Sequence, residues 1–136
     1  MRSSPTRLLA VIVGGLYLVG GIAAFVISAG MGFFAGPGRL LVGVFSTNPS
    51  AAVLDILIGA ALVMAGLATV AAAKTLTTIV GAVFLVIGLA GLFVIGTSFN
   101  VLALNGADNA LHFASAVILL GVGLGAERTV TTAVTS

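Results

Sequence analysis

The sequence contains no cysteine and no tryptophan, and its 136 residues include one histidine and one tyrosine. The absence of cysteine excludes disulfide bonds and thiolate metal sites. One histidine cannot form a histidine-rich metal site, so we predict no bound metal and no cofactor. One histidine and three acidic residues also do not supply a nucleophile, a base and an orienting group for catalysis. We therefore expect a protein that is not an enzyme.

Charge is equally scarce, at 6% of the residues. Soluble domains carry roughly 25% charged residues, so this chain could not cover a water-facing surface. Five lysines and arginines are too few for a nucleic-acid interface, and we exclude nucleic acid as a partner. What the chain has instead is 60% hydrophobic residues and a mean hydropathy of +1.35. This composition is typical of a protein that lies in a lipid bilayer.

Four apolar segments reach bilayer length, at residues 8–30, 50–73, 78–99 and 108–125. The first follows a basic start, as in a signal peptide. Its apolar run of about 22 residues nevertheless exceeds the 7–15 of a signal core, so we interpret it as a retained span. The short connection at residues 74–77 makes the second and third spans antiparallel neighbours. We predict one all-α domain over residues 1–136, an antiparallel four-helix transmembrane bundle.

Local signals mark the connections between these spans. Asn48-Pro49 reads as an N-cap followed by proline at the first helical position. Asp108 is the predicted N-cap of the fourth span, because its carboxylate can accept amides of the first turn. Residues 39–45 (RLLVGVF) follow a Gly-Pro-Gly breaker and are predicted to form a short interfacial helix.

Small residues recur at helical spacing in two of the spans. Gly20, Ala24 and Ser28 follow one another at intervals of four, and Gly121 and Gly125 have the GxxxG spacing. Such ridges allow close helix packing in membranes, and we assign these five residues to helix contacts.

The chain also carries an internal repeat. Residues 12–23 (IVGGLYLVGGIA) align with residues 79–90 (IVGAVFLVIGLA), and Asp55 aligns with His112 in the second half of each unit. Glycine, valine and leucine recur by chance in membrane chains, which is the alternative explanation. Because both helices of each unit align in the same order, we favour two tandem helical hairpins related by a pseudo-twofold axis.

The basic residues predict the orientation in the membrane. Four spans put both termini on one side, and that side holds four of the five cations, namely Arg2, Arg7, Lys74 and Arg128. Arg39 alone lies opposite. The positive-inside rule therefore predicts a multi-pass cell-membrane protein with cytoplasmic N and C termini.

The outer face then holds Arg39, Asp55, Asp108 and His112. A lone carboxylate within a span costs about 2.5–3.5 kcal/mol on insertion scales, so Asp55 should have a partner. The repeat puts Asp55 and His112 at equivalent depth, where a pseudo-twofold axis would turn them towards each other. We predict that these four residues form one polar cluster. A packing role, proton handling and ligand binding all stay open for His112.

Two segments resemble a family of small four-helix integral membrane proteins of unknown function, common in actinobacteria (the domain-of-unknown-function 4383 type). In FSTNPSAAVLDILIGA (45–60), Asn48, Pro49 and Gly59 match the family pattern. In LNGADNALHFASAVILL (104–120), the matching residues are Asp108, Asn109, Leu111 and His112. The chain has Asp55 where the family usually has histidine. The resemblance covers about residues 8–125 and implies a four-helix membrane fold without an established activity.

Two functions are compatible with this pattern. The first is a non-enzymatic accessory or interaction subunit that packs in the bilayer against another membrane protein or against itself. The alternative is a proton- or small-solute-handling protein that uses Asp55 and His112. The alternative requires polar groups that continue across the bilayer.

Overall fold

A computed structural model describes residues 4–127 of the chain. In this part, the helices are α1 (Pro5–Ile27), α2 (Pro49–Ala68), α3 (Val70–Val94) and α4 (Gly106–Gly125). All four are long and apolar enough to cross a membrane. The predicted all-α, four-helix membrane bundle is confirmed, and the protein is a multi-pass membrane protein.

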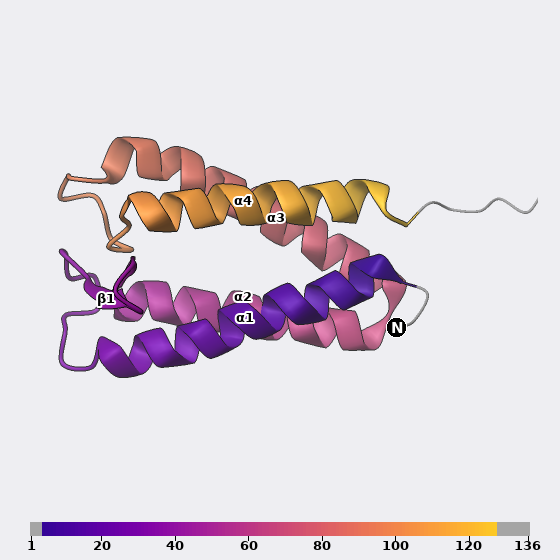
Figure 1. Cartoon of the computed structure of the whole chain (residues 1–136), viewed down its shortest axis with the longest axis horizontal. Helices are drawn as coiled ribbons and strands as arrows, with labels where there is room; N and C mark the ends of the chain where they lie inside the picture. The colour runs from indigo at the N-terminus through magenta and orange to yellow at the C-terminus, as the bar shows by residue number, and fades with distance from the viewer. Residues whose placement is uncertain (1–3, 128–136) are drawn as a thin grey trace, which may run out of the picture.

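The helices form two antiparallel hairpins (Figure 1). Helix α1 packs chiefly against α2, and α3 packs chiefly against α4. The two described ends of the chain and the α2–α3 junction lie at one end of the molecule, which we call the terminal end. The 28–48 and 95–105 connections lie at the opposite end, which we call the loop end.

The junction between α2 and α3 lies at Thr69, not at residues 74–77. Thr69 is extended, and its hydroxyl accepts a hydrogen bond from the Ala72 amide at 3.0 Å, so it caps α3. Residues 74–77 are the first turns of α3, and the predicted boundaries 50–73 and 78–99 were wrong here. Lys74 can lie within α3, because a lysine near a helix end can extend its ammonium group to the membrane surface.

Two spans also end earlier than predicted. Helix α1 ends at Ile27 and α3 at Val94, whereas the predicted ends were 30 and 99. Gly30 and Gly96 follow these ends with φ of +82° and +83°. A left-handed glycine just after a helix is a common terminator, because it suffers no Cβ penalty there.

Residues 39–47 form a β-hairpin, so the predicted interfacial helix was wrong. Strand β1 (Arg39–Leu41) pairs antiparallel with β2 (Phe45–Thr47), and Leu41 lies opposite Phe45. The tight turn between the strands contains Gly43 with φ of +73°. Val42 beside it is also left-handed, with φ of +48°, and two consecutive left-handed residues end a helical run and suit a tight hairpin turn.

The hairpins pack through glycines that bring two helix backbones together. A Cβ on Gly14 of α1 would lie 2.8 Å from Leu62 Cβ of α2, and a Cβ on Gly81 of α3 would lie 3.1 Å from Leu119 Cβ of α4. Gly14 aligns with Gly81 in the repeat, and Leu62 aligns with Leu119. Both hairpins therefore use equivalent positions for close contact.

The predicted packing residues divide into two groups. Ala24 and Ser28 are buried. Gly20, Gly121 and Gly125 have no atom within 4 Å of an added Cβ, so they do not pack against another helix of this chain. The glycines of α1 in tightest contact with α2 are instead Gly14 and Gly21, which are seven residues apart.

Polar contacts hold the terminal end together. Arg7 donates from Nε to the Gly66 carbonyl at 2.8 Å and from Nη2 to the Leu67 carbonyl at 3.1 Å, which caps the end of α2. The Ser4 hydroxyl donates to the Glu127 carboxylate. This hydrogen bond lowers the pKa of Glu127, because it favours the charged carboxylate.

Candidate functional site

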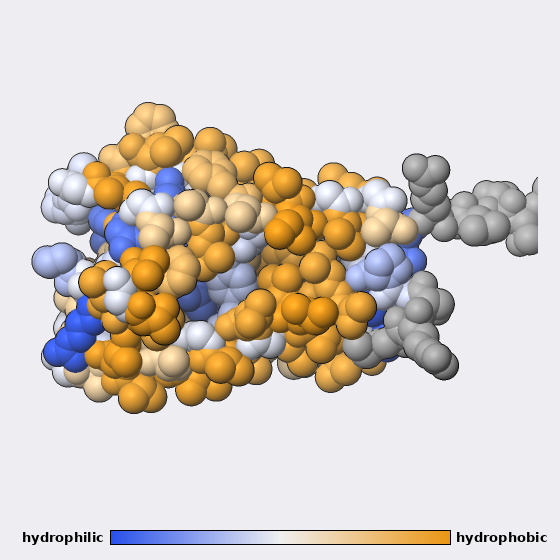
Figure 2. Space-filling model, in the orientation of Figure 1, coloured by the Kyte–Doolittle hydropathy of each residue, from blue (hydrophilic) through white to orange (hydrophobic). Residues whose placement is uncertain are grey.

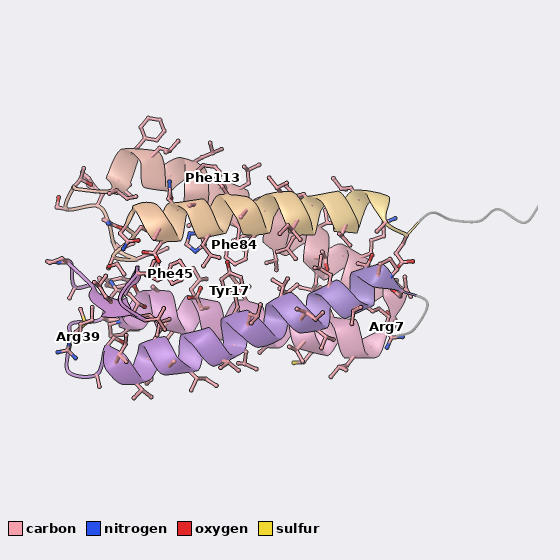
Figure 3. The ribbon with its side chains drawn as sticks, in the orientation of Figure 1. Arg7, Tyr17, Arg39, Phe45, Phe84 and Phe113 are labelled. Atoms are coloured by element: carbon pink, nitrogen blue, oxygen red, sulfur yellow. The ribbon has the colours of Figure 1, made fainter. Side chains whose placement is uncertain are left out.

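A cavity of about 360 Å³ lies between the two hairpins, towards the loop end. Helices α1, α2 and α4 supply most of its wall, and the β-hairpin contributes Leu41, Phe45, Ser46 and Thr47. Figure 3 shows Phe45, Tyr17 and Phe84 in the space between the hairpins. The volume lies at the lower end of the range of about 300–1,000 Å³ that is usual for small-molecule pockets.

Polar side chains converge on this otherwise apolar cavity. Asp55 of α2, Asp108 and His112 of α4, and Tyr17 of α1 all line it. The structure thus places three of the four predicted cluster residues around one space. Within residues 4–127, however, no hydrogen bond or salt bridge joins Asp55 to His112.

Arg39 does not belong to this cluster, contrary to the prediction. Its Nη1 donates to the carbonyls of Ile27 at 2.8 Å and Ala29 at 2.9 Å, and the side chain is exposed. Figure 3 shows Arg39 beyond the end of α1, at the loop end of the molecule. The last carbonyls of a helix lack partners within the helix and carry partial negative charge, so they attract the guanidinium.

Asp108 is not the N-cap of α4 either. Asn105 is the cap and accepts the Asp108 amide at 2.9 Å, while the Asp108 carboxylate accepts the Asn105 amide at 2.9 Å. This reciprocal capping box starts the helix earlier than predicted. The same carboxylate accepts the Ser46 amide at 3.2 Å, which attaches the β-hairpin to α4.

Asn48 caps α2 and also connects it to two loops. Its side-chain oxygen accepts the Ala51 amide at 3.0 Å. Its amide nitrogen donates to the carbonyls of Ala35 at 3.0 Å and Val101 at 2.9 Å. Because Asn48 is fully buried, all three bonds form away from water.

An aromatic stack supports the inner end of the cavity. Phe84 of α3 stacks on Tyr17, with ring centroids 4.7 Å apart, and on His112 at 5.2 Å. The Tyr17 hydroxyl forms a 2.7 Å hydrogen bond with the Ser115 hydroxyl. The stack therefore fixes α1, α3 and α4 around the cavity.

His112 keeps one nitrogen without a partner. The residue is 8% exposed, and its Nδ1 is buried with no hydrogen-bond partner among residues 4–127. Buried polar atoms are usually satisfied, so an unsatisfied one beside a cavity marks a position for a ligand or a water molecule.

The sequence prediction did not include Tyr17 or Ser115 in the site. A usable signal was present for both residues. Ser115 lies three residues after His112 and so shares its helical face. Tyr17 aligns with Phe84, so its hydroxyl is the polar difference between two otherwise equivalent positions.

The cavity opens sideways, between α1 and α4. Leu16 and Ile118 both line it, yet they are 70% and 49% exposed on the surface that faces lipid. Figure 2 shows a hollow in this hydrophobic surface with hydrophilic atoms inside it. A molecule dissolved in the bilayer could therefore reach the polar groups without passing through the loop end.

The model of one protein family, described as a domain of unknown function (DUF4383), matches residues 7–125. The chain belongs to this family. The predicted resemblance is thereby confirmed, and every residue discussed around the cavity lies within the matched DUF4383 region. Neither the curated proteins nor the solved structures contain a significant match.

Proposed function

We propose that this DUF4383 protein is a non-enzymatic membrane protein that binds a small solute in the cavity between its hairpins. The observation that carries the proposal is an apolar cavity lined by Asp55 and His112, where the Asp55 carboxylate and the Nδ1 atom of His112 have no hydrogen-bond partner among residues 4–127. An apolar pocket with a few convergent polar groups is the usual form of a small-molecule site.

The contacts favour binding over catalysis. The Ser115 hydroxyl, which lies one turn from His112, bonds to Tyr17. A serine nucleophile would instead need a hydrogen bond to its base.

The apolar core favours binding over conduction across the membrane. Leu62 of α2 and Leu119 of α4 are fully buried and lie seven residues beyond Asp55 and His112, towards the terminal end. They pack with Ile58, Val80 and Ala116 in one hydrophobic core, and such a core is costly for a proton or a polar solute to cross.

The proposal can be tested by filling the cavity. Gly20 lines the cavity, and no atom of residues 4–127 lies within 4 Å of an added Cβ there, so we expect a Gly20→Leu side chain to occupy part of the cavity. Gly15 also has open space but does not line the cavity, and Gly15→Leu is the matched control.

Binding of phenylbutanol and of phenylbutylammonium would be measured in nanodiscs, with empty nanodiscs as the partition blank. We expect saturable binding to the native protein and to Gly15→Leu, and at least tenfold weaker binding to Gly20→Leu. Partition equal to the blank for both probes would refute the proposal.

We further propose that the protein lies in the cell membrane with both termini in the cytoplasm. Arg7 and Lys74 support this orientation because they lie at the terminal end, whereas Arg39 lies at the loop end. Arg2 and Arg128, which contribute to the same prediction, lie outside the described residues.

A second candidate is an accessory role through contact with another membrane protein or a second copy of the chain. It is supported by Gly121 and Gly125, which are exposed on α4 with open space beyond them. Exposed glycines allow the backbone of a second helix to come close to α4. Blue-native electrophoresis with cross-linking would show a larger species that Gly121→Leu disrupts, and a strictly monomeric native protein would contradict this role.

A further inference from the structure

We propose that the ligand of the cavity is a lipophilic amine, an apolar molecule with one ammonium group that binds Asp55. The inference rests on the proposed function and specifies the ligand class. Three features of the cavity support it: its acidic side chains, its hydrogen-bond acceptors and its route of access.

The cavity wall contains acidic side chains. Asp55 and Asp108 line it, and no lysine or arginine does so within residues 4–127. The Asp108 carboxylate already accepts two backbone amides, whereas Asp55 forms no hydrogen bond or salt bridge in the described part of the chain. An ionised carboxylate at membrane depth is costly unless a cation pairs with it, so the free Asp55 favours a cationic ligand.

The cation is organic rather than a metal ion. No group of three His, Cys, Asp or Glu side chains in residues 4–127 is arranged to hold a metal. An ammonium group needs fewer and less rigid contacts, because each of its N–H bonds can meet a separate acceptor. Besides Asp55, His112 lines the cavity, and a neutral imidazole ring has one nitrogen that can accept a hydrogen bond.

The rest of the ligand is apolar. Most of the wall is aliphatic, with Val13, Leu54 and Ile118 among the lining residues. The opening faces lipid between α1 and α4, and the β-hairpin covers the loop end. A molecule that partitions into the bilayer reaches this cavity most directly. Its apolar body exchanges lipid for an aliphatic wall at little cost, and its ammonium group gains the Asp55 carboxylate as a partner.

The protein carries its own probe for this binding. Tyr17 lines the cavity and is the only tyrosine in a chain without tryptophan. In nanodiscs whose scaffold protein lacks tryptophan and tyrosine, the intrinsic fluorescence of the full chain therefore reports on the cavity. Phenylbutylammonium and phenylbutanol form a matched pair, since they have the same apolar body and differ in the charge of the head group.

We expect phenylbutylammonium to bind the native protein about tenfold more tightly than phenylbutanol, after correction with empty nanodiscs, because a charged partner strengthens the hydrogen bonds of Asp55. Asp55→Asn and Asp55→Ser both remove the charge, and each should abolish the preference while phenylbutanol still binds. Retained phenylbutanol binding shows that the variant is folded.

Equal affinity of the native protein for the two probes would overturn the inference and leave the proposed function intact. A tenfold preference that persists in the two Asp55 variants would also overturn it. If neither probe binds the native protein, both the inference and the proposed function fail.

Discussion

Replacing one glycine at the α1–α2 contact tests the packing that shapes the cavity. An added Cβ at Gly14 would lie 2.8 Å from the Gly59 carbonyl oxygen, from Leu62 Cβ and from the Val63 amide. Ordinary van der Waals contact begins near 3.4 Å, so the two helices would have to separate by roughly half an ångström. Two of the three neighbouring atoms are backbone, so a side-chain rotation cannot relieve the clash.

The adjacent Gly15 supplies the control, because no atom lies within 4 Å of an added Cβ there. Alanine gains up to about 1 kcal/mol over glycine from helix propensity, and this gain applies to both Gly14→Ala and Gly15→Ala. Overpacking costs about 1–3 kcal/mol and applies to Gly14→Ala alone. We therefore expect Gly14→Ala to be less stable than Gly15→Ala by about 1–3 kcal/mol.

The assay is reversible unfolding by sodium dodecyl sulfate in mild detergent, followed by far-ultraviolet circular dichroism. Equal midpoints for Gly14→Ala and Gly15→Ala would refute the close α1–α2 contact. A midpoint for Gly15→Ala below that of the native protein would refute the assignment of Gly15 to open space.

Three further predictions concern the ends of the molecule. Asn48→Ala should destabilise the protein by about 2–4 kcal/mol in the same unfolding assay, because the helix loses its cap and two buried carbonyls lose their donor. Asn48→Asp keeps the cap but turns a buried carboxylate oxygen towards the two carbonyls, so it should cost at least as much, and a smaller cost would contradict the role of the amide donors. Reporter fusions at Ser136 and in the loop at Gly36 should report opposite sides of the membrane, with Ser136 cytoplasmic, and a cytoplasmic signal from Gly36 would contradict the topology. The pKa of Glu127 is lowered in the folded protein, so its contribution to stability should be present above the unfolded carboxyl pKa and should be lost as pH falls through the folded value. Glu127→Gln should remove this part of the pH dependence of stability, and an unchanged pH profile would argue against the Ser4 contact.

The spans were predictable because each is a continuous apolar segment that ends at polar or glycine-rich sequence. The start of α2 could also be predicted from the sequence, since Asn48 and Pro49 are a local cap signal that needs no tertiary contact. Thr69 was not, because the chain stays apolar on both sides of it and only its side-chain bond to Ala72 marks the junction.

The site was predictable only where it follows from helical spacing and the repeat. The alignment of Asp55 with His112 pointed to two residues that both line the cavity, although no hydrogen bond joins them within residues 4–127. The position of Arg39 depends on the path of a loop and on free carbonyls at the end of α1, which spacing does not reveal. The cavity contribution of Phe45 follows from a β-hairpin whose turn requires a left-handed Gly43.

The repeat itself stays a prediction for the whole hairpins. Residues 8–73 should superpose on residues 75–125 in an experimental structure, with α1 on α3 and α2 on α4. The equivalent glycine contacts at Gly14 and Gly81 support this pairing. A best superposition that places α1 on α4 would contradict the duplication.

Nuclear magnetic resonance of the two unique cavity side chains tests the ligand site most directly. The chain has one tyrosine and one histidine, and Tyr17 and His112 both line the cavity, so selective labelling of their rings yields one assigned residue of each kind. On titration of phenylbutylammonium into the labelled protein in nanodiscs, the account predicts that both sets of ring signals shift saturably with the same midpoint, and that Gly20→Leu abolishes the shifts. Ring signals that stay unchanged while the probe partitions into the bilayer would contradict a ligand site between the hairpins.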